Sequence, residues 1–414
     1  MRAGAAISIS FLLIVAGCKL NTDYFSEYRG KNLLANYGFS ATNTGPPVTN
    51  KWNLLSDATL TAAGVGYQTT DYMTWEKISN TANSDYSSDL TAGTPTTGLD
   101  GSPSYRLEIK NLLPDGDFEA VGDTGTSFAQ SFWSANVAAD ATFNATTGTD
   151  SNGVPTTISH NTLLFGSVSP GDILTLNVSN AVSTMAARTG NYRFHMDFYN
   201  ASANVSVPIA LTNPSADWSQ TVAAASTTLY SVSEEFAPSG SPSIAIGSAS
   251  NQNTLVYIDN VRIVYTSIDP SVYMALPTLE SGGLTLLPGT KSGDYVFTFY
   301  VRDDPTADET AAYHVGNRLY PSGVTVRFNA AQQPGSQTPS PVFIARDSTW
   351  ATGWKKITVS AGFNFVESDS QIAAAGKTNA LEIYLSPTET NSTSSGGPDA
   401  GSLLIAQPSL VFNP

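Results

Sequence analysis

The sequence has one cysteine, few charged side chains and no long apolar run beyond its first residues. Because Cys18 is the only cysteine in 414 residues, no intrachain disulfide or cysteine-based metal site is expected in the body of the chain. Charged residues make up 13% of the chain and the formal net charge is −15, which argues against nucleic acid and anionic lipid as partners. After residue 18, no segment approaches the roughly 20 apolar residues that span a bilayer.

The sequence also lacks the common catalytic motifs. It has no GxSxG, HExxH or Walker pattern, and its three histidines, His160, His195 and His314, are not spaced as metal ligands. A pair of glycosidase carboxylates stays open as an alternative, because two acids need only meet in space. The sequence therefore predicts a binding or structural protein rather than an enzyme.

The N-terminus has the layout of a secretory signal. Residues 1–17 begin with one arginine, continue through a short apolar run and end on small residues. Val15-Ala16-Gly17-Cys18 resembles the lipobox of bacterial lipoproteins, which implies that Cys18 is acylated and becomes the new N-terminus. The alternative is an ordinary signal peptide with an incidental cysteine. We expect an exported protein whose lipid is its only membrane attachment, at the outer membrane or cell surface, with residues 18–31 as a tether.

Alternating apolar residues dominate the rest of the chain. Examples are DILTLNV at 172–178, YRFHMDF at 192–198 and VYIDNVRIV at 256–264. Alternation of this kind marks strands with one face on a core, and turn-forming residues separate the segments. The sequence therefore predicts an all-β protein of the sandwich type.

Four landmarks occur twice in the chain, which indicates an internal repeat. The matching pairs are 32–39 with 111–118, Trp52 with Trp133, 292–299 with 189–196, and 403–412 with 256–265. One copy, 111–266, holds its four landmarks in sequence, whereas the other has two before residue 110 and two after 290.

This split order predicts one domain inserted into another. The host would comprise residues 32–110 and 267–414, and the insert residues 111–266. SYRLEIK at 104–110 would take the place that DILTLNV holds in the complete copy. Three tandem domains are the alternative, although 32–110 would then form an unusually small sandwich.

The complete copy resembles jelly-roll carbohydrate-binding modules and their galactose-binding-like relatives. The resemblance rests on NLLPDGDFE, the tryptophan that follows it, GNYRFHMDF and the closing YIDNVRI. It covers residues 111–266 and, more weakly, the two flanking pieces, and it implies a jelly-roll β-sandwich fold for both. Together with the split order of the repeat, this predicts two jelly-roll β-sandwich domains, the second inserted into the first. Relatives of this architecture serve as sugar binders, adhesion modules or spacers, so the fold alone does not define the function.

The resemblance also implies a structural calcium ion in the 111–266 domain. Such modules hold the ion between their opening and closing strands, which here places Glu119 and Asp259 as ligands with Asp117 beside them. The alternative is that these acids are solvated at strand ends. The host copy has Ser40 and Ala406 at the equivalent positions, so it is expected to lack the site.

Tryptophans are the first candidates for sugar platforms, since the C–H face of a sugar packs on an aromatic ring. Trp52 and Trp133 recur at equivalent places, so a core role explains them better. Trp75, Trp218 and Trp350 lie in or near turn-like stretches without a counterpart, and we expect them to be exposed.

Strand 192–199 offers a second candidate site. With its apolar residues on the core, Arg193, His195, Asp197 and Tyr199 share the opposite face. They could bind the hydroxyls of a glycan, or they could form a solvated face with cross-strand pairs. Two functions therefore remain: a surface lipoprotein that binds carbohydrate, and a structural or adhesive one that contacts another protein.

Overall fold

The computed structural model describes the chain in separate stretches, to which the statements below refer. These are residues 32–34, 53–54, 61–62, 67–69, 71–78, 99, 104–114, 116, 118, 132–135, 141–145, 161–167, 171–182, 185, 189–212, 218–224, 230–248, 254–267, 272–275, 293–308, 318–331, 340–363, 380–388 and 400–413. Most of them form strands, joined by short helical pieces at α2 (Val178–Ala181), η3 (Pro305–Ala307) and α3 (Thr349–Thr352). The prediction of an all-β fold is confirmed. None of the described helices is long and apolar enough to cross a membrane.

Two five-stranded antiparallel sheets form from residues between 133 and 265, with the orders β13-β10-β15-β8-β7 and β12-β11-β14-β9-β6. Their strands are β6 (Trp133–Ala135), β7 (Ala141–Ala145), β8 (Asn161–Ser167), β9 (Leu174–Asn177), β10 (Tyr192–Asn200), β11 (Val207–Thr212), β12 (Trp218–Val222), β13 (Tyr230–Phe236), β14 (Ser243–Ile246) and β15 (Thr254–Tyr265). The alternation in β10 explains the packing, because Tyr192, Phe194, Met196 and Phe198 are fully buried while their neighbours point outward. We call this unit the inserted lobe.

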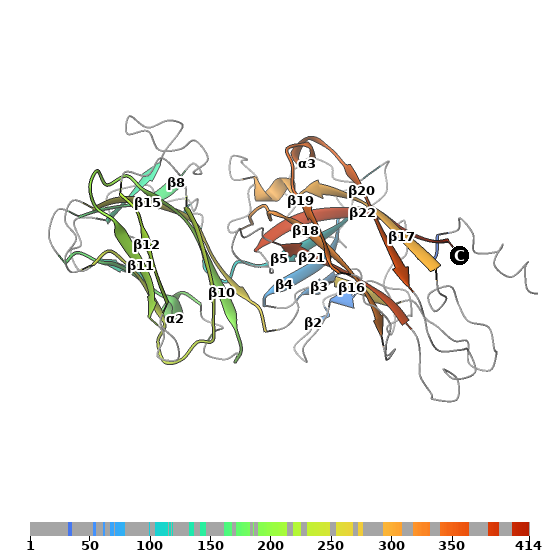
Figure 1. Ribbon diagram of the computed structural model, residues 1–414, viewed down its shortest axis with the longest axis horizontal. Coiled ribbons are helices and arrows are strands. Elements are labelled where there is room, and N and C mark those ends of the chain that lie inside the picture. The colour runs from blue at the N-terminus through green and yellow to red at the C-terminus, as the bar shows by residue number, and fades with distance from the viewer. Residues whose placement is uncertain are drawn as a thin grey trace, which may run out of the picture.

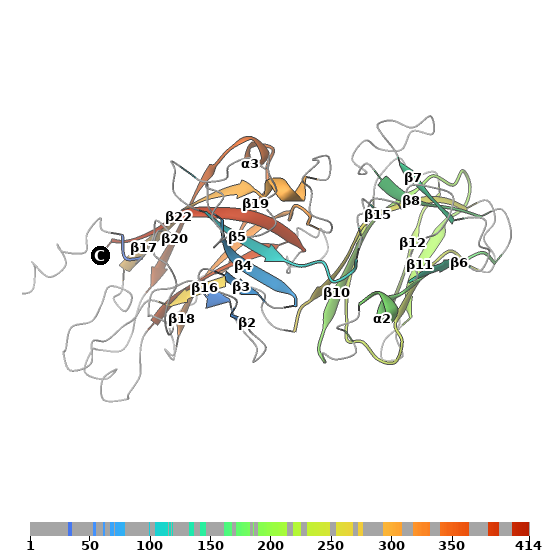
Figure 2. The same ribbon diagram turned by 180° about the vertical axis from the view of Figure 1, so that it is seen from behind.

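The other two sheets combine both ends of the chain, with the orders β2-β3-β4-β5-β22-β17-β20 and β1-β16-β21-β18-β19. Early strands are β1 (Asn53–Leu54), β2 (Thr61–Ala62), β3 (Tyr67–Thr69), β4 (Met73–Ile78) and β5 (Ser104–Ile109). Late strands are β16 (Val272–Ala275), β17 (Gly293–Asp303), β18 (Gly323–Ala331), β19 (Val342–Ala345), β20 (Lys355–Phe363), β21 (Ala380–Thr388) and β22 (Gly401–Asn413). Figure 1 shows the blue early strands beside the red late ones in one lobe, the host lobe, and the green inserted lobe next to it. Figure 2 shows the same division from behind.

The two lobes have the same order of strands, which shows that residues 104–110 do not correspond to DILTLNV as expected. In the inserted lobe β8 pairs with the closing strand β15, and in the host lobe β5 pairs with the closing strand β22. Residues 104–110 therefore take the place of β8, not of the DILTLNV segment. The counterpart of DILTLNV is β16, since β16 pairs with β21 as β9 pairs with β14. Alternation marks a strand but does not show which sheet it joins.

An asparagine ties the opening segment of each lobe to its closing strand. The Asn111 side chain accepts from the backbone N–H of Leu113 and Ile263, at 3.1 and 2.9 Å, and donates to the carbonyl of Val261 at 2.9 Å. Asn32 makes the same three contacts in the host lobe, where the partners are Leu34, Leu410 and Pro408. The repeated sequence Asn-Leu-Leu thus encodes a repeated hydrogen-bond pattern.

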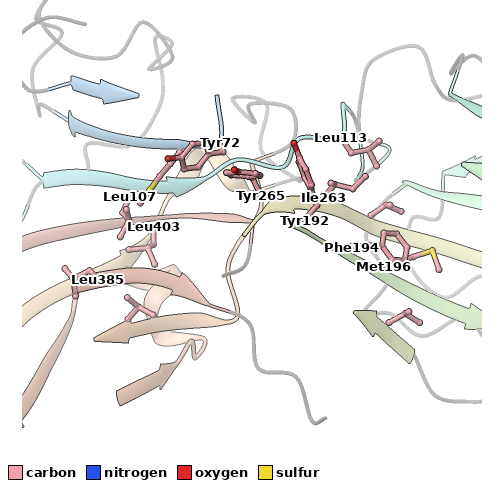
Figure 3. Packing of buried hydrophobic residues seen from close by; sticks show 14 of the residues in the cluster. Tyr72, Leu107, Leu113, Tyr192, Phe194, Met196, Ile263, Tyr265, Leu385 and Leu403 are labelled. Atoms are coloured by element: carbon pink, nitrogen blue, oxygen red, sulfur yellow. The ribbon is translucent and has the colours of Figure 1, made fainter. Parts of the chain in front are cut away.

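The apolar cores of the two lobes meet through aromatic rings. The ring of Tyr265 lies 5.4 Å from Tyr72 of the host lobe and 5.1 Å from Tyr192 of the inserted lobe. Figure 3 shows these rings between the aliphatic residues of the two lobes. One continuous cluster of buried apolar side chains therefore runs through both lobes.

A second contact lies beside these rings. Val264 of the inserted lobe packs with Ile109 and Ala400 of the host lobe, and all three are buried. Nη1 of Arg262 donates to the carbonyl of Ala400 at 3.2 Å. These contacts hold the two lobes together next to the points where the chain crosses between them.

Candidate functional site

The four candidates on β10 are partly brought together. Nε2 of His195 lies 3.3 Å from a carboxylate oxygen of Asp197, and Arg193 lies 3.5 Å from Glu235 on the neighbouring strand. Tyr199 is 5% exposed and packs against Tyr257, so it is less accessible than expected. The cross-strand ion pair of Arg193 matches the alternative of a self-satisfied sheet face.

The carboxylate of Asp197 is bonded by its neighbours. Ser231 donates to it at 2.7 Å and the side chain of Asn260 donates at 3.1 Å. Burial would raise the pKa of Asp197, but the hydrogen bonds from His195 and Ser231 outweigh burial and lower it. In a catalytic triad the histidine lies between serine and acid, whereas here the acid lies between the other two. Ligand binding by this cluster stays a prediction.

Two of the three expected tryptophan platforms are wrong. Trp75 is 1% exposed, because it occupies a core-facing position of β4 opposite Leu107 and stacks on Tyr105 at 4.5 Å. Trp350 in α3 is also 1% exposed and belongs to the central apolar cluster. Trp218 at the start of β12 is half-buried and packs against that cluster. Trp75 and Trp350 therefore stabilise the core and offer no open ring to a ligand, whereas a role for Trp218 in binding stays a prediction.

Only part of the expected calcium site can be described. Asp117 and Glu119 lie outside the described residues. Asp259 is 1% exposed, and its Oδ1 accepts from the backbone N–H of Asn260 at 2.7 Å. Strand pairing places Asp259 opposite Asp197 and Ala406 opposite Tyr300, which makes Asp259 and Ala406 equivalent. The calcium site stays a prediction for the inserted lobe.

A face that sequence reasoning missed lies on the host lobe. On β18 and β21, Val326, Phe328, Ile383 and Leu385 are buried in the core. The residues between them point to the opposite side and are half-buried. We call this surface the β18/β21 face and define it by Thr325, Arg327, Asn329, Glu382, Tyr384 and Ser386.

The centre of the β18/β21 face is organised by cross-strand contacts. The guanidinium carbon of Arg327 lies 4.3 Å from the ring centroid of Tyr384, a cation–π distance. Oε2 of Glu382 accepts from the Tyr384 hydroxyl at 2.7 Å and from the Asn329 side chain at 2.9 Å. Burial, together with the hydrogen bond to Glu382, raises the pKa of Tyr384 above its ordinary value, so the phenol keeps its proton.

The strand pairing continues beyond β18 and β21 on both sides. Tyr273 on β16 is the strand partner of Tyr384, and Asn53 on β1 is the partner of Tyr273. On the other side, Phe343 of β19 is the partner of Thr325. The β18/β21 face thus combines the aromatic ring of Tyr384 with amide and guanidinium donors and a carboxylate acceptor.

The equivalent row of the inserted lobe has small side chains. The host row is Asn53, Tyr273, Tyr384 and Arg327, from β1 to β18. Trp52 and Trp133 are equivalent landmarks, so Ser134 corresponds to Asn53. Following the pairings from Ser134, the inserted row is Ser134, Thr175, Ala245 and Ala210. The inserted lobe therefore forms the same order of strands without aromatic or charged residues at these positions.

A buried group of charges supports the other sheet of the host lobe. Arg106 donates to Asp304 at 2.6 Å and to Glu76 at 3.0 Å, and Ser402 also donates to Asp304 at 2.7 Å. Burial would raise the pKa of Asp304, but the charges of Arg106 and Arg318 hold it far below its usual range. These groups satisfy one another, which indicates a structural role in holding the segment after β17 on the sheet.

Comparison with protein-family models finds no match, and comparison with curated proteins finds none. Similar solved structures include the N-terminal CBM22-1-CBM22-2 tandem domain of Paenibacillus barcinonensis Xyn10C, with 10% identity and a TM-score of 0.27 over 73% of this chain and 98% of that chain. TmCBM61 in complex with beta-1,4-galactotriose has 11% identity and a TM-score of 0.26 over 38% of this chain and 99% of that chain. Paenibacillus xanthan lyase has 13% identity and a TM-score of 0.22 over 77% of this chain and 28% of that chain. Identities and scores of this size assign no activity, so function must be argued from the site.

Proposed function

We propose that the chain is an exported, lipid-anchored protein that binds carbohydrate without catalysis, and that the β18/β21 face is its binding surface. A sugar ring presents a C–H face that packs on aromatic rings and hydroxyls that need both donors and acceptors. Tyr384, Arg327, Asn329 and Glu382 supply these groups side by side.

The contrast between the two lobes is the observation that carries this proposal. Ala245 and Ala210 occupy the positions that Tyr384 and Arg327 hold in the host lobe. Since the inserted lobe forms this sheet with alanine at both positions, we infer that the large side chains of the host lobe serve a ligand and not the architecture. Half-buried aromatic and polar residues without a folding role are typical of a ligand surface.

A glycan array with residues 19–414 tests the proposal. We expect retention of at least one polysaccharide, and we expect Tyr384→Ala and Arg327→Ala each to weaken it about tenfold, equivalent to about 1.4 kcal/mol. Both variants copy side chains found in the sister lobe, so thermal unfolding should remain close to that of the parent. Thr175→Ala on the inserted lobe is the matched control and should bind normally. If no glycan is retained, or if the two variants bind as the parent does, the proposal is wrong.

The lipid anchor has its own test. The apolar run ending in Val15-Ala16-Gly17-Cys18 supports acylation of Cys18. Cys18→Ser should abolish labelling by a fatty-acid analogue and release the protein from the membrane fraction, because the thiol that receives the lipid is gone. Unchanged labelling of the variant would refute the anchor.

A further inference from the structure

The charges of the β18/β21 face balance one another. On the outward positions described for β18, β19 and β21, Arg327 is the one cation and Glu382 the one anion. The chain as a whole carries a formal net charge of −15. Among these described positions a polyanion therefore finds no excess of positive charge, and it must approach against the net negative charge of the chain.

The carboxylate of Glu382 can accept further hydrogen bonds. Both of its hydrogen bonds, from Tyr384 and Asn329, reach Oε2, and within the described part of the chain none reaches Oε1. An ionised carboxylate accepts hydrogen bonds and donates none. It therefore suits a hydroxyl of a sugar and repels a carboxylate or sulfate of an acidic sugar.

The donors of the face lie within reach of the same ligand. Arg327 pairs across the strands with Tyr384, and Asn329 with Glu382, so Arg327 and Glu382 are diagonal neighbours about 7 Å apart. The guanidinium carries several N–H donors and no acceptor. Adjacent hydroxyls of a neutral sugar can accept from Arg327 and donate to Glu382 together, because each hydroxyl does both.

Building on the proposed function, we infer that the ligand is a neutral polysaccharide whose adjacent hydroxyls lie between Glu382 and Arg327. Glu382 acts as the residue that excludes polymers of uronic or sulfated sugars.

Affinity electrophoresis of residues 19–414 tests this inference. The gels contain a neutral polymer (galactan, xylan or glucomannan) or an anionic one (polygalacturonate, xanthan or chondroitin sulfate), at about 0.02 and 0.3 M NaCl. We expect at least one neutral polymer to retard the protein, with an affinity that changes less than about twofold between the two salt concentrations, and no anionic polymer to do so. Retardation by anionic polymers alone, lost at high salt, would overturn the inference and leave carbohydrate binding intact. Retardation by none would overturn carbohydrate binding itself.

A near-isosteric variant isolates the part played by Glu382. Glu382→Gln removes the charge and keeps the shape, so binding to an anionic polymer should appear or strengthen about tenfold. Glu234→Gln on β13 of the inserted lobe removes the same charge elsewhere and should change nothing. If both variants gain anionic binding equally, the net charge of the chain and not Glu382 excludes these polymers, and the inference fails.

Discussion

At the scale of single residues, one asparagine has the same role in both lobes. The side chains of Asn32 and Asn111 each satisfy three backbone groups between the opening segment and the closing strand. A side chain that serves three partners cannot be removed without leaving buried backbone groups unsatisfied.

Asn111→Ala should therefore lower the free energy of unfolding by about 2 kcal/mol, since at least one strand N–H loses its acceptor. Asn32→Ala should have an effect of similar size. Urea denaturation followed by circular dichroism measures both, and Asn204→Ala, at an exposed position, is the control. A loss below about 0.5 kcal/mol in both asparagine variants would show that water replaces the side chain.

The sequence did not predict which aromatic side chains point into the core and which point to solvent. Trp75 was expected to be exposed because turn-forming residues surround it, yet its direction depends on its pairing with Leu107. Tyr384 lies in a regular alternating segment, and its contact with Arg327 joins strands that are distant in sequence. The sequence predicts which residues of one strand share a face. The residue that lies opposite on the adjacent strand depends on how the strands pair.

At the scale of elements, the closing strands show how far the repeat could be followed. Asn260 in β15 and Gln407 in β22 both have positive φ, at 48° and 44°, and a register shift lies opposite each strand. The alignment of Asp259 with Ala406 was thus correct at the level of single residues. The counterpart predicted for SYRLEIK was wrong, because it is β8 and not β9. The two strands follow each other in the sequence with the same alternation, although they belong to different sheets.

The closing strand of the inserted lobe, β15, contains Asp259 of the predicted calcium site. Calcium should raise the melting temperature of residues 19–414, with a stabilisation of about 2.7 kcal/mol at 100 times the dissociation constant. Asp259→Ala should abolish this response, because it removes one of the three carboxylates, with Asp117 and Glu119, that are predicted to bind the ion. Calorimetry before and after chelator treatment makes the measurement, with magnesium as the control ion. A melting temperature that does not depend on calcium would show that these acids bind no metal.

At the scale of the whole molecule, strands from before residue 110 and strands from after residue 290 pair in one sheet of the host lobe. β5 lies between β4 and β22, so residues 32–110 do not complete a sheet by themselves. The split order of the landmarks predicted that early and late strands share a sheet, whereas the division into domains stays a prediction. The aromatic contact between the lobes could not be foreseen, since Tyr72 lies outside the repeated landmarks and only the tertiary structure brings it to Tyr265.

Separated lobes should therefore fold but melt early. Residues 111–266 alone, and residues 32–110 joined by a short linker to 267–414, should each unfold cooperatively. The inserted lobe should be less stable by about 2 kcal/mol, because Val264 and Tyr265 lose their apolar cover. Differential scanning calorimetry of both chains and of residues 19–414 measures this. A stable fragment of residues 32–110 would favour tandem domains instead.

The bonds between residues 32–34 and the closing strand have a mechanical consequence. The N–H of Leu33 donates to the carbonyl of Leu410 at 2.8 Å, so a pull on the preceding segment is first resisted at β22. β22 pairs with β17 over residues 403–413 and with β5 over residues 401–405, so it shares the load with both strands in shear. The chain leads from β17 to β18 and from β21 to β22. The inserted lobe leaves the chain elsewhere, between β5 and β16. Tension between the tether and a ligand on that face would therefore bypass the inserted lobe.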